Sequence, residues 1–165
     1  MATKKQSTAE VGKPAPAFTL EGSGGKPVSL GDYIGKKVIL FFYPKDMTTA
    51  CTQEACDFRD AHVALKGRNT VILGISMDDT ARHGKFIAKY DLPYELLTDA
   101  EHAVCELYGV WQLKKLYGRE YMGIVRSTFL IDEQGVLVQE WRNLKVKGHV
   151  DNVVAAIAAA ESAKV

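Results

Sequence analysis

The chain has 165 residues, the size of one ordinary domain and enough to bury a hydrophobic core. Basic and acidic residues nearly balance, 21 against 20, so no excess charge points to nucleic acid or a membrane surface. No apolar stretch is long enough to span a bilayer, and residues 1–12 lack the apolar centre of a secretory signal. We therefore expect one domain over residues 1–165, cytoplasmic, with residues 1–10 flexible.

Turn residues and apolar periodicity divide the chain into strands and helices. In chain order, the sequence predicts strands 18–20, 28–29 and 37–43, helix 51–66, strand 70–76, a helix from 78–79 to about 90, strand 95–97, helix 100–108, strands 127–131 and 136–141, and helix 149–163. Alternating strands and helices argue for an α/β domain, with a mixed central sheet flanked by helices and an N-terminal β-hairpin. A closing antiparallel hairpin followed by a helix is typical of the thioredoxin-like fold.

Cys51 stands where a polar loop, coming from the buried strand 37–43, meets the start of a predicted helix. A helix N-terminus offers free N–H groups and a partial positive charge, and both favour the thiolate, which is the nucleophilic form of cysteine. The alternative is that Cys51 is only a small buried apolar residue. Its position after Pro44 and Thr48, at a helix start, favours a nucleophile.

Cys56 follows Cys51 at the spacing C-x4-C. On one regular helix, Cα atoms five residues apart lie about 8.7 Å from each other, and the side chains project about 140° apart. A disulfide tolerates a Cα separation of no more than about 7 Å. A Cys51–Cys56 bond therefore requires the first turns of the helix to unwind, which predicts a switch between a folded reduced state and a locally unfolded oxidised state. The alternative is an unreactive Cys56 that faces the core.

Three other features could belong to a site. Arg126, just before the predicted strand 127–131, is either a surface charge or a cation that reaches the helix N-terminus from a neighbouring strand. Cys105 lies among apolar helix residues and is interpreted as core. A zinc site needs four ligands as a rule, and the histidines have no metal spacing, so we interpret them as solvated or structural: His62, His83, His102 and His149.

Residues 42–60, FYPKDMTTACTQEACDFRD, resemble the active-site segment of peroxiredoxins, and specifically of the bacterioferritin comigratory protein (peroxiredoxin Q) subfamily, which is of the atypical 2-Cys type. Residues 11–18, VGKPAPAF, and 125–132, VRSTFLID, also match. The resemblance covers roughly residues 10 to 160. It implies a thioredoxin-like peroxidase for antioxidant defence, often monomeric, with no metal, haem or flavin.

By this resemblance Pro44, Thr48, Cys51 and Arg126 form the peroxidatic site. Cys51 would attack hydrogen peroxide or an organic hydroperoxide and become a sulfenic acid. Cys56 would resolve it as an intramolecular disulfide, which thioredoxin or a similar dithiol protein would reduce. Thr48 would hold the thiolate and the peroxide oxygen, Arg126 would supply positive charge, and Pro44, lacking an N–H, would shield the pocket.

The chain departs from the family directly before Cys51, where Thr49-Ala50 stands in place of the usual Pro-Gly. This departure affects the loop geometry, the reaction rate and the ease of unwinding. Two other functions stay open at this stage. One is a non-enzymatic redox sensor or thiol-regulated binding protein that uses the same switch. The other is a general dithiol–disulfide exchange protein, which is disfavoured because such proteins use C-x2-C.

Overall fold

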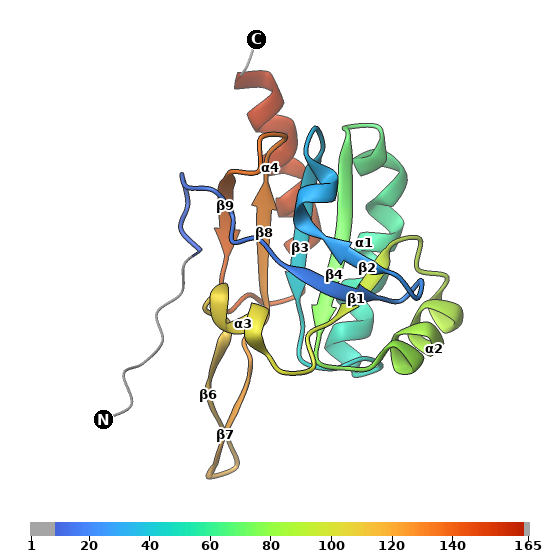
Figure 1. The fold of residues 1–165 in the computed structure, drawn as a ribbon, viewed down its shortest axis with the longest axis vertical. Coiled ribbons are helices and arrows are strands. Elements are labelled where there is room, and N and C mark those ends of the chain that lie inside the picture. Colours follow the sequence, from blue (N-terminus) through green and yellow to red (C-terminus); the bar gives the residue numbers. More distant parts are fainter. Residues whose placement is uncertain (1–8, 164–165) are drawn as a thin grey trace.

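A mixed β-sheet runs through the centre of the molecule (Figure 1). The computed structural model describes residues 9–163. The strands of the sheet are β1 (Thr19–Gly22), β2 (Pro27–Ser29), β3 (Lys37–Phe42), β4 (Thr70–Ser76), β5 (Glu95–Thr98), β8 (Ser127–Ile131) and β9 (Leu137–Trp141). They are ordered β2-β1-β5-β4-β3-β8-β9. β3, β4 and β5 run parallel, and every other neighbouring pair is antiparallel.

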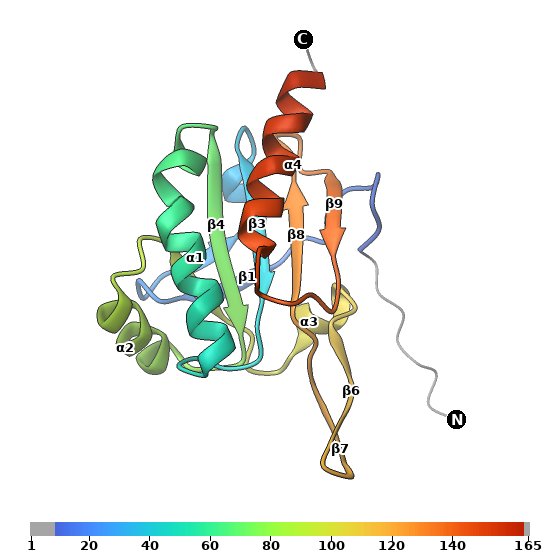
Figure 2. The same cartoon turned by 180° about the vertical axis from the view of Figure 1, so that it is seen from behind.

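Helices cover both faces of this sheet. α1 (Thr49–Lys66) and α4 (His149–Ala163) lie together on one face, in front of β3, β4 and β8 in Figure 2. α2 (Thr80–Tyr90) lies beside α1, and the short α3 (Ala103–Leu107) lies on the opposite face. A single turn of 3-10 helix, η1 (Leu30–Tyr33), follows β2.

The central strand β3 shows why both faces are covered. All its residues are buried, and successive side chains of a strand point to opposite faces. Ile39 and Phe41 pack in one core with Phe58 of α1, whereas Leu40 and Phe42 pack in the other. A strand that is apolar on both sides needs cover on both sides, which the α1–α4 layer and the α3 side provide.

The strands predicted at 70–76 and 127–131 and the helix predicted at 149–163 are confirmed at both ends. The helix start predicted at Cys51 is wrong by one half-turn, because Thr48 is the N-cap and α1 begins at Thr49. The helix predicted at 100–108 is too long. Residues 100–101 form a turn, and His102 has φ +52° as the N-cap of α3, so helical backbone begins only at Ala103.

A hairpin that the sequence did not predict projects from the lower end of the domain (Figure 1). It consists of β6 (Trp111–Leu116) and β7 (Arg119–Ile124), which pair with each other as a separate two-stranded sheet. Its outer part buries no apolar face. At the N-terminus, residues 1–8 of the segment expected to be flexible lie outside the described residues, and the backbone N–H of Ala9 donates to the carbonyl of Leu107.

Candidate active site

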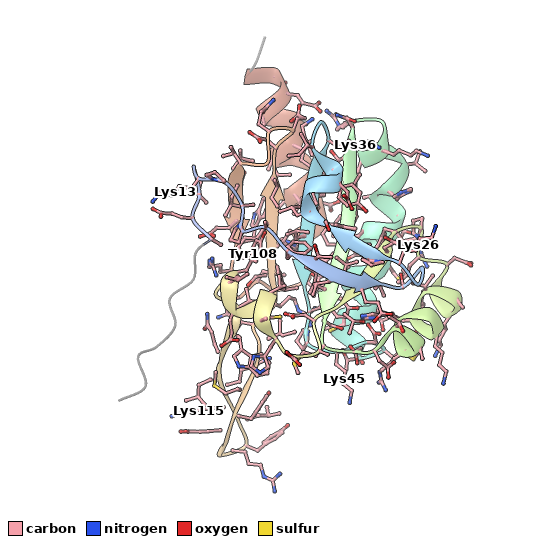
Figure 3. All side chains as sticks on the ribbon, viewed as in Figure 1. Lys13, Lys26, Lys36, Lys45, Tyr108 and Lys115 are labelled. Atoms are coloured by element: carbon pink, nitrogen blue, oxygen red, sulfur yellow. The ribbon has the colours of Figure 1, made fainter. Side chains whose placement is uncertain are left out.

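The carboxyl end of β3 and the start of β8 lie side by side, because Phe42 pairs with Ser127 in the antiparallel register. The loop after β3 leads to Cys51, and Arg126 directly precedes β8. The loop that leads to Cys51 and the residue Arg126 are far apart in the sequence but meet at one end of the sheet. Lys45, in this loop, marks that end in Figure 3, from which the hairpin carrying Lys115 projects.

Arg126 connects Cys51 to a buried carboxyl group. Its Nη2 donates to Cys51 Sγ at 3.2 Å, and its Nη1 donates to Glu54 Oε1 at 2.8 Å. Cys51 is 1% exposed and Glu54 is fully buried. Burial lowers the pKa of Arg126, but the charges of Glu54 and Cys51 raise it more, so the guanidinium stays charged. The expectation that Arg126 reaches the helix start is met.

Glu54 is the site residue that the sequence reasoning missed. Burial raises its pKa to about 7, although Arg126 acts in the opposite direction. Its Oε1 faces Arg126, while its Oε2 has no hydrogen-bond partner among residues 9–163. The available signal was its spacing, because a residue three positions after Cys51 lies on the same face of a helix.

Thr48 and Pro44 flank the loop that enters α1. Thr48 is the N-cap, and its carbonyl accepts from the N–H of Thr52 at 2.8 Å. Its hydroxyl donates to the carbonyl of Lys45 at 2.9 Å rather than to Cys51. Pro44 is half-buried directly after β3. Both residues are near the helix start, as expected, and their roles toward peroxide stay predictions.

Cys51 and Cys56 are free thiols on one continuous helix. Cys56 is partly exposed, and burial raises its pKa, with Arg59 as the main opposing influence. It is therefore held as a thiol, the less nucleophilic form, while α1 is intact. Cys105 is buried in the core beside Asp99, as its interpretation as a core residue predicted, and burial raises its pKa strongly.

No three His, Cys, Asp or Glu side chains within residues 9–163 are grouped to hold a metal ion. Nor does any helix in that span have the length and apolar character needed to cross a membrane.

Residues 11–140 match the model of the AhpC/TSA family. The chain belongs to the AhpC/TSA family. Peroxiredoxin Bcp of Bacillus subtilis (strain 168) is 54% identical over 143 residues, which is 87% of this chain and 91% of that relative. The solved structure of Xanthomonas campestris peroxiredoxin Q has a TM-score of 0.82 and 39% identity, covering 86% of this chain and 90% of that one. The crystal structure of a PrxQ mutant from Xylella fastidiosa has a TM-score of 0.89 and 31% identity, covering 94% of this chain and 99% of that one.

This AhpC/TSA protein is thus a peroxiredoxin of the Bcp/PrxQ type, a thiol-dependent peroxidase with a thioredoxin-like fold. The expected family, fold class and enzyme class are confirmed. The individual roles of the site residues in this peroxiredoxin stay predictions: Pro44, Thr48, Cys51, Cys56 and Arg126.

Proposed function

We propose that Cys51 is the nucleophile that reduces hydrogen peroxide and organic hydroperoxides. Its thiolate sulfur attacks one peroxide oxygen, an S–O bond forms and the O–O bond breaks. The departing oxygen takes a proton and leaves as water or an alcohol. The sulfur, oxidised by two electrons, becomes a sulfenic acid. Arg126 is placed to stabilise both the thiolate and the negative charge that develops on the departing oxygen.

Cys56 then resolves the sulfenic acid. Its sulfur bonds to that of Cys51, the S–O bond breaks, and the hydroxyl leaves with a proton as water. Because both residues lie on α1, this step needs the first turn to unwind. A dithiol protein such as thioredoxin restores both thiols by disulfide exchange. We further propose that the enzyme is a monomer, that it acts in the cytoplasm, and that it serves antioxidant defence.

The observation that carries the proposal is the hydrogen bond from Arg126 to Cys51, with Glu54 fixing the other side of the guanidinium. Steady-state peroxide reduction with thioredoxin tests it. Cys51→Ser should abolish turnover, and full turnover in that variant would refute the assignment. Cys56→Ser should consume one equivalent of peroxide without forming the internal disulfide.

A further inference from the structure

Next to the loop that leads to Cys51, three buried side chains form a hydrogen-bonded chain that the proposed chemistry does not use. The hydroxyl of Tyr43 donates to Asp46 Oδ1 at 2.5 Å. His83 Nδ1 lies 2.7 Å from Asp46 Oδ2, and His83 Nε2 lies 3.1 Å from the carbonyl oxygen of Leu97. Tyr43, Asp46 and His83 are all fully buried. We call these three side chains the loop latch.

The partners identify the donor at each end of the loop latch. A carbonyl oxygen only accepts, so His83 Nε2 carries a hydrogen and donates to Leu97. One carboxyl oxygen of Asp46 accepts from the Tyr43 hydroxyl, and the other shares a hydrogen bond with His83 Nδ1. Burial and the charge of Asp46 raise the pKa of Tyr43 well above its ordinary value, which keeps the hydroxyl a donor. The latch is therefore a closed chain of buried hydrogen bonds that runs from Tyr43 through Asp46 and His83 to the carbonyl of Leu97.

The backbone of the loop is anchored at the same residue. The N–H of Asp46 donates to Asp78 Oδ2 at 2.8 Å, and Asp78 is itself paired with Arg82 of α2 at 3.2 Å. The next residue, Met47, has φ +65°, a conformation that a non-glycine residue adopts only at a cost. Thr48, the N-cap of α1, follows immediately. The anchored residue thus holds an unfavourable loop shape two residues from the helix start.

We propose that Tyr43, Asp46 and His83 are positioning residues for the second catalytic step, because they set how often the loop and the first turn of α1 open. The inference rests on the proposed function, since it concerns the lifetime of the sulfenic acid on Cys51. While the latch is closed, Cys51 stays beside Arg126. When the loop opens, Cys56 can reach the Cys51 sulfur and condense with it, releasing water.

The latch then controls a competition between two fates of the same sulfenic acid. Either Cys56 forms the disulfide, or a second peroxide transfers one oxygen to Cys51, giving a sulfinic acid and water or an alcohol. A latch that opens rarely favours the second fate. Weakening it should speed disulfide formation and protect Cys51 from overoxidation, with little change in the first attack on peroxide.

Tyr43→Phe and His83→Asn test the proposal by rapid mixing with hydrogen peroxide. The former removes one hydroxyl, so it remains informative if the latter fails to fold. Trapping of the Cys51 sulfenic acid gives the rate of peroxide attack. Intact-mass measurement gives the rate of disulfide formation. It also gives the peroxide concentration at which sulfinic acid forms. Loss of one buried hydrogen bond predicts disulfide formation about fivefold faster in Tyr43→Phe. The sulfinic-acid threshold should rise by a similar factor.

Tyr108→Phe is the matched control. Tyr108 is also fully buried, but its hydroxyl donates to the carbonyl of Pro16, in the core on the other side of the sheet. It should form the disulfide at the parent rate. Unchanged resolution in Tyr43→Phe and His83→Asn, or equal acceleration in Tyr108→Phe, would overturn the latch. A parent protein that forms no sulfenic acid on Cys51 would overturn the proposed function as well.

Discussion

Glu54 lies 2.8 Å from Arg126, and the same guanidinium lies 3.2 Å from the sulfur of Cys51. Glu54 and Cys51 are one turn apart on α1, so a single cation bonds twice to the same helix face. Unwinding the first turn would break the bond to Cys51. The arrangement that stabilises charge during peroxide attack is thus the one that has to be released before Cys56 can react.

Truncating Glu54 should slow peroxide attack, because Glu54 holds the guanidinium that bonds to Cys51. Glu54→Ala leaves Arg126 free to turn away, and the second-order rate of Cys51 oxidation should fall about 10- to 100-fold. Glu54→Gln keeps an oxygen acceptor and should lose less. Stopped-flow measurement of the rate of Cys51 oxidation tests this prediction. Glu140→Ala, which removes the ion-pair partner of Arg142, is the matched control. Equal rates in Glu54→Ala and the parent would show that Arg126 needs no partner.

The raised pKa of Glu54 predicts that stability falls as pH rises. Between 4.5, its unfolded value, and about 7, the folded protein holds a proton that the unfolded chain has released. The free energy of unfolding should therefore decrease across this window, by about 3 kcal/mol at about 1.4 kcal/mol per pKa unit. Chemical denaturation from pH 4.5 to 8 measures the slope. Glu54→Gln should lack this contribution, and identical slopes in both proteins would contradict it.

His149 should act in the opposite direction. It is nearly fully buried, lies 2.8 Å from the hydroxyl of Thr128, and burial lowers its pKa to about 4, with Arg126 adding to the effect. The unfolded chain takes up the proton first, so stability is lost as pH falls from about 6.5 toward 4. Because Glu54 masks this trend, the comparison is made in Glu54→Gln protein with and without His149→Gln. A loss at low pH that persists in the double variant would exclude His149 as its source.

Restoring proline directly after the N-cap should stiffen the switch. Thr49 is the first residue of α1, where the N–H has no helical partner, and Thr48 has the extended conformation that a following proline requires. Thr49→Pro should stabilise the first turn by about 0.4–1 kcal/mol and slow disulfide formation about two- to fivefold. Rapid quenching followed by intact-mass measurement gives the rate of disulfide formation.

Thr80→Pro is the control for this substitution, because Thr80 is also the first residue of a helix after an extended N-cap, Asp79. It should stabilise the protein without changing disulfide formation. Faster or unchanged resolution in Thr49→Pro would show that the first turn does not limit this step.

Local sequence patterns predicted most of the strands and helices, but not the hairpin β6–β7. The strands 70–76 and 127–131 are continuous apolar runs with clear ends, so periodicity located them. The outer part of the hairpin β6–β7 has no buried face, and its turn at Tyr117 and Gly118 carries no Asn-Gly or Asp-Gly signal. Both turn residues have positive φ, as a type I′ turn requires. A tyrosine is unusual at such a position, so the sequence did not predict the turn.

The sequence predicted the site residues whose own chemistry marks them. Cys51 and Arg126 could be paired because Arg126, at a strand start, could reach the helix N-terminus from a neighbouring strand, and because the resemblance put both residues in one site. Glu54 and His83 could not, because their importance comes from burial next to specific partners. A glutamate on a helix is usually solvated, and only the packed structure shows that this one is fully buried against Arg126.

The central claim is that Cys51 receives the peroxide oxygen. Treating Cys56→Ser protein with one equivalent of hydrogen peroxide and a sulfenic-acid trap, followed by peptide mass mapping, tests it most directly. We expect one label per chain, on the Cys51 peptide, and none in Cys51→Ser protein. A label on Cys105, or undiminished labelling in Cys51→Ser, would contradict the claim.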